Sequence, residues 1–395
     1  MRSLRERLMA VSSQPRKENA PPRREDSYFH RVHHVPLDDL CGICGTTLED
    51  VRACDPLFSG SCWDIQRILF LDTETTGLSG GAGTLAFEIG VGYISGMEMV
   101  IHQYIMRDYS EEAAMLSDLA ALIDRFDTLV TFNGKSFDIP LLESRMILNR
   151  IRTRMSAYPH LDLLHAARRV YKLRLKRCSL SALEEAVLGQ KRNGDLPGAE
   201  VPQRYFDYLK TRECALLEDV LHHNFLDVRN LAALTGHLCS VYRQPDQLAF
   251  AEDLMGVGKT LMRGGHTQKA RSCFRILGHS SLSSQAHMHL AASYKKEHEW
   301  NKAVASYQSM IAAGEGGIWP YIELAKYYEH VAHDTERALR CATHALSLSL
   351  NMAALGGGEE QTLAAIRKRI NRLRRKEAAR MSSSQAMHFK EDTPK

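Results

Sequence analysis

The chain has 395 residues, of which 44% are hydrophobic and 25% charged, and its formal net charge is +4. This composition excludes a fibrous or wholly disordered protein, and the mild positive charge permits a nucleic-acid partner without demanding one. No apolar run is long enough to span a bilayer, and the basic N-terminus lacks the apolar core of a signal peptide, so we expect a cytoplasmic protein with no membrane partner.

The N-terminal part of the chain offers few apolar side chains to bury. Residues 1–35 mix Arg, Lys, Ser and Pro, which predicts a basic flexible arm. Residues 36–61 form a lead-in segment that contains the pair Cys41 and Cys44. The nine cysteines of the chain, an odd number, favour reduced thiols over a disulfide framework. Because no second close cysteine pair follows, the spacing disfavours a zinc site, and metal binding by this pair stays open.

The segment 62–242 is predicted to form one layered domain of the α/β or α+β class. Strands with one crossover helix come first, and further helices then pack on the sheet. The expected strands cover 68–72, 85–94, 97–106 and 128–132, and the expected helices cover 111–126, 138–150, 162–173, 179–188, 202–210 and 214–240.

A repeat is visible in the helical part of the chain beyond Gln244. The trio Leu, Ala and Tyr at positions 290, 291 and 294 recurs 34 residues later, which is the tetratricopeptide period. We therefore expect tetratricopeptide-like helical repeats over 243–355, which would dock a protein partner or guide a substrate. Residues 356–395 form a basic amphipathic helix and tail, for which a capping helix with a solvated face is slightly favoured over a nucleic-acid contact.

Two acids stand at the end of the first expected strand of the layered domain. Asp72 and Glu74 are two residues apart, so their side chains point to the same face of a strand. Two carboxylates this close are costly to hold together without a cation between them. The segment alone is also compatible with a solvated strand end and a Thr-Gly turn.

Two further segments carry acids at element boundaries. Asp138 begins a helix directly after the strand 128–132, with Asn133 in the turn between them, where a lone Asp is usually an N-cap. His223 and Asp227 lie four residues apart in a long helix and share one face.

Together, Asp72, Glu74, Asp138 and Asp227 form a set of hard oxygen donors, which suits Mg²⁺ or Mn²⁺ better than Zn²⁺. Two such ions about 4 Å apart can activate a water and stabilise the leaving 3′ oxygen of a phosphodiester. His223 would orient or deprotonate that water, since imidazole has a suitable pKa.

The segments DTETTGL, NGKSFD and HNFLD resemble the three exonuclease motifs of the DEDD superfamily. With GTLAFEIGVGY, LDLLHAARR, LSALEEAVLG and DLPGAEVPQRYFDYL, the chain resembles the YprB-type ribonuclease-H-like family over about 180 residues. The resemblance implies a ribonuclease-H-like mixed sheet flanked by helices, a centre with two Mg²⁺ or Mn²⁺ ions, and 3′ to 5′ exonuclease hydrolysis of single-stranded DNA or RNA.

Carried over by position, Asp72 and Glu74 match the first motif, Asp138 the second and Asp227 the third, as catalytic residues and metal ligands. Asp162 stands where many relatives have an acid between the second and third motifs. We expect it to support the site without binding metal.

The third motif departs from the superfamily pattern, because His223 stands where relatives carry Tyr and His222 stands at the usual histidine offset. A helix already formed at residue 222 turns that side chain about 140° from Asp227, so His223 is favoured. The residues expected to hold the terminal nucleotide are Thr75, Thr76, Gly77 and Asn133. A turn held by small residues explains the threonines and the glycine equally well.

Two other functions fit the same residues. One is a nucleic-acid-binding or scaffold protein on a nuclease fold, with weak or no catalysis, and the other is an endonuclease that cuts internally. The candidates for stacking on single-stranded bases are Phe87, Phe137 and Tyr205, with Arg204 beside them. No motif distinguishes DNA from RNA.

Overall fold

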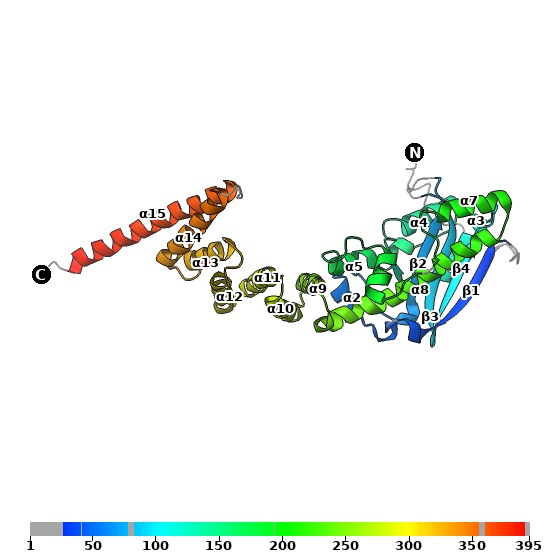
Figure 1. Ribbon diagram of the computed structural model, residues 1–395, viewed down its shortest axis with the longest axis horizontal. Coiled ribbons are helices and arrows are strands. Elements are labelled where there is room, and N and C mark those ends of the chain that lie inside the picture. The colour runs from blue at the N-terminus through cyan, green and yellow to red at the C-terminus, as the bar shows by residue number, and fades with distance from the viewer. Residues whose placement is uncertain (1–26, 41, 78–82, 193, 355–359, 392–395) are drawn as a thin grey trace, which may run out of the picture.

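The computed structural model describes residues 27–40, 42–77, 83–192, 194–354 and 360–391 (Figure 1). Cys41 and most of the expected basic arm lie outside the described residues. A domain built on a sheet occupies one end of the molecule and a row of paired helices extends from it, so that α15 (Glu360–Glu391) lies at the other end (Figure 1).

Six strands form one mixed sheet in the order β1, β4, β3, β2, β5, β6. The first four of these pair antiparallel, and β2, β5 and β6 pair parallel. The strands are β1 (Phe29–Pro36), β2 (Ile68–Thr75), β3 (Ala86–Ser95), β4 (Glu98–Ile105), β5 (Thr128–Thr131) and β6 (His160–Asp162). This mixed sheet, flanked by helices and followed by a helical region, confirms the predicted fold class.

Strand β1 corrects the expectation of a flexible arm over 1–35, because residues 29–36 pair along their whole length with β4. The strand alternates between half-buried and exposed side chains, but its inward set includes Arg31 and His33. His33 packs on Phe225 with ring centres 4.7 Å apart. An edge strand with so few aliphatic side chains gives no apolar alternation to find in the sequence.

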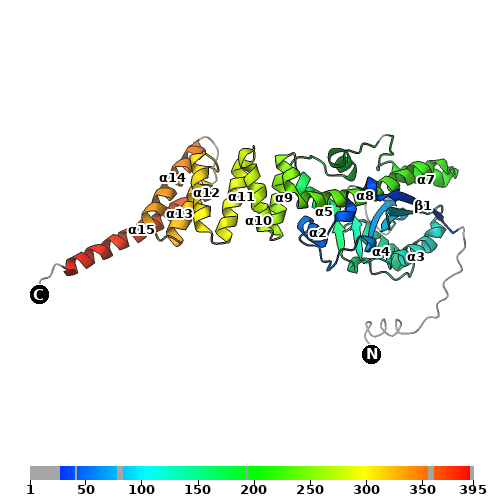
Figure 2. The ribbon, with the colours of Figure 1, turned by 90° about the horizontal axis from the view of Figure 1, so that it is seen from below.

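Helices cover both faces of the sheet (Figure 2). Alternate residues of β2 divide between two apolar clusters, so Leu69 and Leu71 pack under one set of helices while Ile68 and Phe70 pack under the other. The first set is α3 (Glu112–Ile123), α4 (Asp138–Leu148) and α7 (Val201–Thr211), and the second is α2 (Leu48–Cys54), α5 (Leu163–Tyr171) and most of α8 (Ala215–Arg243).

Two glycines of β3 let α8 approach the sheet closely. A Cβ atom at Gly90 would lie 2.1 Å from Asn224 Oδ1, and one at Gly92 would lie 2.9 Å from Val228 Cγ1. Because α8 lies this close to β3 and to its neighbour β2, its side chains over residues 223–227 can meet those at the end of β2.

The C-terminal region is helical, with α9 packed on α10, α11 on α12, and α13 on α14. The helices are α9 (Ala251–Arg263), α10 (Thr267–Ile276), α11 (Ser283–Lys296), α12 (Trp300–Ala312), α13 (Trp319–His330) and α14 (Thr335–Ala354). One apolar cluster runs without a break from the sheet through α12 to Leu324 of α13. Among the described residues, no helix is both long and apolar enough to cross a membrane.

Candidate metal centre

Side chains from three separate elements gather at one end of β2. Asp72 and Glu74 project from β2 on the face that α8 covers, and His223 and Asp227 project from α8. Asp138 is the first residue of α4, and its Oδ1 accepts a 2.5 Å hydrogen bond from the Thr73 hydroxyl. The structure thus brings together all five side chains that the sequence proposed for the catalytic centre.

Glu74, His223 and Asp227 each offer one donor atom, and these three atoms lie within 4.8 Å of one another. His223 Nε2 is 3.8 Å from Glu74 Oε1 and 3.6 Å from Asp227 Oδ2, too far for direct hydrogen bonds. The three donor atoms therefore surround one small volume. His222 is exposed on another side of the helix, so the histidine that faces this volume is His223.

Burial and mutual repulsion shift the carboxyl groups strongly. Burial, followed by repulsion from the neighbouring carboxylates, raises the pKa of Asp72 and of Glu74 well above ordinary values. Burial also raises the pKa of Asp138 to about 6. The pKa of Asp227 is raised by burial although Arg192 and His223 oppose the shift. Such a cluster binds protons or cations in preference to remaining as bare charges.

Asn224 links Asp72 to the buried interior of the sheet. Its Nδ2 donates to Asp72 Oδ2 at 3.1 Å, while its Oδ1 accepts from Gln103 Nε2 at 3.2 Å. Gln103 Nε2 also donates to Glu88 Oε1 at 3.0 Å. These contacts fix the orientation of Asp72 from behind.

Asp162 fixes the turn that leads to Asp138. It is 1% exposed, and its carboxylate accepts hydrogen bonds from the backbone N–H groups of Asn133 at 2.8 Å, Lys135 at 3.2 Å and Leu164 at 3.1 Å. Asn133 has a left-handed backbone (φ 68), which Asn tolerates better than most residues. Asp162 therefore shapes the approach to α4, in keeping with the supporting role expected for it.

The turn after β2 uses the hydroxyls that were candidates for nucleotide binding. Thr75 Oγ1 donates to Gly77 O at 2.8 Å, and Thr76 Oγ1 accepts from Leu85 N at 3.0 Å. These bonds are those of a turn held by small residues, the alternative interpretation of this segment. Contact between a nucleotide and Thr75, Thr76, Gly77 or Asn133 stays a prediction.

Comparisons with known proteins agree with this fold. Residues 69–239 match the RNase_H superfamily model. The chain is 33% identical over 337 residues to YprB of Bacillus subtilis (strain 168), itself an uncharacterized protein, and the match covers 84% of this chain and 80% of YprB. The chain belongs to the YprB family. A family B DNA polymerase from Pyrobaculum calidifontis matches with a TM-score of 0.36 and 16% identity, over 58% of this chain and 30% of the polymerase.

In this member of the YprB family, a second group of charged residues surrounds the centre. No role in the site was predicted for this group from the sequence. Arg192 donates hydrogen bonds to three carboxylates. Its partners are Asp227 Oδ1, Glu184 at 2.5 Å and Asp195 at 2.9 Å. Asp195 Oδ2 in turn lies 2.8 Å from His223 Nδ1. In the sequence, Arg192 and Asp195 are an arginine and an aspartate three residues apart in a loop between two helices. Such a pair is usually solvated, and nothing in the sequence places the loop against α8.

Two of the expected stacking residues are unavailable to a base. Phe87 and Tyr205 are fully buried and stack on each other with ring centres 4.0 Å apart, so their proposed role is wrong. They complete the apolar cluster under α7. Phe137 is 52% exposed and directly precedes Asp138, so it remains a candidate for stacking.

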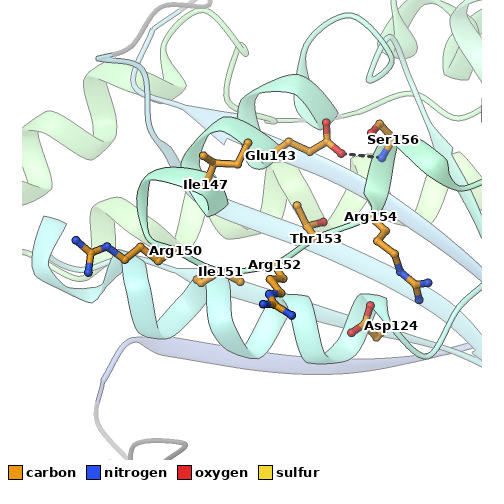
Figure 3. A pocket seen from close by; sticks show the side chains of 9 residues that line it. All are labelled: Asp124, Glu143, Ile147, Arg150, Ile151, Arg152, Thr153, Arg154 and Ser156. Carbon is orange, nitrogen blue, oxygen red and sulfur yellow. Dashed lines mark hydrogen bonds between the residues drawn. The ribbon is translucent and has the colours of Figure 1, made fainter. Parts of the chain in front are cut away.

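A hollow of about 750 Å³ lies at the end of α4 remote from Asp138 (Figure 3). Arg150, Arg152 and Arg154 line it, together with Asp124 and Glu143. No residue of the metal centre contributes to this hollow.

The zinc alternative gains no support within the described part of the chain. Cys44 and Cys62 are exposed, Cys54 is buried, and all three are free thiols. The described His, Cys, Asp and Glu side chains that form a possible cation site are Glu74, His223 and Asp227. Cys41 lies outside the described residues.

Proposed function

We propose that this chain is a metal-dependent 3′ to 5′ exonuclease of the DEDD type, which hydrolyses phosphodiester bonds of single-stranded DNA or RNA. The observation that carries the proposal is the meeting of Asp72, Glu74, Asp138 and Asp227 beside His223 in a ribonuclease-H-like domain. These residues come from β2, α4 and α8, which are far apart in the sequence.

The donor set fits two hard divalent cations. Four carboxylates supply oxygen ligands, and no cysteine lies among them, which favours Mg²⁺ or Mn²⁺ over Zn²⁺. Burial raises the pKa values of Asp72, Glu74 and Asp138, and repulsion from neighbouring carboxylates adds to the shift, so cations between them would stabilise the charged forms. Asp72, Glu74, Asp138 and Asp227 would hold the ions, which when bound supply activation of a water and stabilisation of the leaving 3′ oxygen.

In this proposal His223 accepts a proton from the attacking water. The pKa of Asp195 is lowered despite its burial, chiefly by the hydrogen bond from Arg192, so Asp195 is an ionised acceptor. Nδ1 of His223 therefore donates to Asp195. Nε2 is then the nitrogen that faces Glu74 and Asp227, at 3.8 and 3.6 Å, and would accept the proton.

The helical pairs α9 to α14 form the second part of the proposal. Their second helices begin at Thr267, Trp300 and Thr335, at intervals of 33 and 35 residues, close to the tetratricopeptide period. We propose that these pairs are tetratricopeptide-like repeats that dock a protein partner or guide the substrate.

A second candidate function is a nucleic-acid-binding or scaffold protein with weak or no catalysis. The contact between Arg192 and Asp227 favours it, because the guanidinium occupies an oxygen of the ligand set. Cation binding through that oxygen requires Arg192 to move away from it.

Labelled strands distinguish the two candidates. Single-stranded DNA and RNA, each labelled at the 5′ or the 3′ end, are incubated with the protein in Mn²⁺, in Mg²⁺ or in chelator, beside an Asp72→Asn variant. Stepwise shortening from the 3′ end, dependent on the cation and absent in the variant, is the expected result and identifies the preferred strand. Binding without any cleavage would contradict the proposal and favour the scaffold. Internal fragments would establish an endonuclease instead.

A further inference from the structure

Helix α15 carries the densest run of positive charge in the described chain. Between residues 364 and 376, seven side chains are Lys or Arg and none is acidic. One side of this helix is apolar, and Ile366, Ile370 and Leu373 are buried against alanines of α13 and α14. The helix is therefore packed onto the helical pairs by one side only.

Three of the seven cations serve that packing. Arg369, Arg372 and Lys376 all contact the carboxylate of Glu329 on α13, at 2.6 to 2.9 Å. Burial alone would raise the pKa of Glu329, but hydrogen bonds from Arg372 and Lys376 lower it to about 2. This ion cluster holds α15 in a fixed orientation on α13.

The other four cations are Arg367, Lys368, Arg374 and Arg375, which we call the cationic stripe. All four are exposed, and none forms an ion pair with any residue that the structure describes. At 100° per residue they lie within an arc of about 120°, and at 1.5 Å per residue they span about 12 Å of the helix. Like charges this close on a helix repel one another, and binding of a polyanion relieves that repulsion.

We infer that the cationic stripe is a binding surface for the phosphate backbone of a nucleic acid, separate from the metal centre. The inference rests on the proposed function for the nature of the polyanion. An amphipathic helix that inserts into a membrane needs a free apolar side, whereas the apolar side of α15 is covered by α13 and α14. The stripe contains no aromatic side chain to stack on bases, so its contacts are with phosphates and carry no sequence preference.

The position of the stripe gives it a distinct role. α15 lies at the end of the molecule opposite the sheet, with the helical pairs between them (Figures 1 and 2). A strand held there is held away from the metal centre. The stripe therefore retains long strands while a distant end is cleaved.

The test measures binding in chelator, so that it does not depend on cleavage. The full chain is titrated against a fluorescent single-stranded oligonucleotide at several salt concentrations, beside an Arg367→Gln/Arg374→Gln variant. The control is an Arg337→Gln/Arg340→Gln variant, whose arginines lie exposed on α14 but pair with Asp334 and Glu336. Far-ultraviolet circular dichroism establishes that both variants remain folded.

We expect the stripe variant to bind more weakly and to lose about 1.4 from the slope of log affinity against log salt, since each phosphate contact of a single strand contributes about 0.7. The control keeps the original slope. An unchanged slope and affinity in the stripe variant would overturn the inference. So would loss of binding to vesicles of anionic lipid with unchanged oligonucleotide binding, which would indicate a membrane surface. Stripe-dependent binding without any cleavage in metal would overturn the proposed function and leave this inference standing.

Discussion

Asp195 accepts a 2.8 Å hydrogen bond from Nδ1 of His223, and this contact determines which nitrogen of the imidazole faces Glu74 and Asp227. A carboxylate at Nδ1 holds the neutral ring in the form whose Nε2 is free to accept a proton. The side chain that orients His223 thus comes from a loop and lies 28 residues before His223 in the sequence.

The first prediction concerns this contact. Asp195→Asn should lower kcat by about 100-fold and leave KM nearly unchanged, because the amide can donate to Nδ1 and favour the wrong ring form. Steady-state cleavage of a 5′-labelled strand measures both constants. Asp195→Glu, which keeps the carboxylate, should recover part of the lost rate. A rise in KM of the same size, with kcat unchanged, would show instead that Asp195 serves substrate binding.

The second prediction concerns Arg192, which neutralises Asp227 in the absence of a cation. Arg192→Gln should destabilise the protein in chelator by about 3 to 5 kcal/mol, because Glu184 is then buried without its partner. Mn²⁺ should raise the unfolding temperature of this variant more than that of the unaltered protein, since no guanidinium competes for Asp227. Arg192→Lys keeps the charge but not the forked set of donors to Glu184, Asp195 and Asp227, so it should be destabilised less than the glutamine variant. A smaller effect of Mn²⁺ on the glutamine variant would contradict competition.

The third prediction concerns the pH dependence of stability in chelator. The pKa of Asp138 is raised to about 6, so its contribution to stability is present at low pH and is lost as pH rises through that value. Asp138→Asn keeps an acceptor for Thr73 but cannot ionise. Relative to the unaltered protein, it should gain about 1 to 1.5 kcal/mol between pH 5 and pH 7.5. Urea unfolding at both pH values measures this difference, and a constant or falling difference would refute the assignment.

The fourth prediction concerns the turn before α4. Asp162→Ala removes the acceptor of three backbone N–H groups and should cost about 2 to 4 kcal/mol of unfolding free energy. The same change should weaken Mn²⁺ binding, because the turn no longer holds Asp138 in place. Asp162→Asn keeps one acceptor oxygen, so its unfolding free energy should lie between those of the alanine variant and the unaltered protein. Calorimetric titration with Mn²⁺ checks the second effect, and unchanged affinity in the alanine variant would contradict it.

The parts of the centre that sequence analysis found are those governed by local periodicity. The two-residue period of a strand placed Asp72 and Glu74 on one face, and the four-residue spacing on a helix placed His223 with Asp227. Both relationships hold in the structure, because Asp72 contacts Asn224 of α8 and Glu74 lies beside His223 and Asp227 of the same helix. The helical pattern around 179–188 was also found, although the structure divides it into α6 (Leu180–Leu183) and a π-helical turn over Glu184–Leu188.

The missing parts depend on contacts between distant segments. Arg192 and Asp195 reach the centre only because their loop folds against α8, and no local pattern encodes that approach. In the sequence, Asn224 is only a polar residue inside a helix. Its place behind Asp72 depends on Gly90 of β3, which has no side chain and so leaves room for it. Strand β1 is recognisable only through its pairing with β4, since its half-buried side includes Arg31 and His33.

The most direct test of the centre uses two acids of the same helix. Asp227 faces Glu74 and His223 in the candidate metal centre, whereas Asp219, eight residues earlier on α8, is exposed. The rate of Mn²⁺-dependent shortening of a 5′-labelled strand is measured for Asp227→Asn and Asp219→Asn beside the unaltered protein. We predict that Asp227→Asn loses cleavage by at least about 100-fold while Asp219→Asn cleaves at the original rate. Equal rates in both variants would contradict a hydrolytic centre built on these carboxylates.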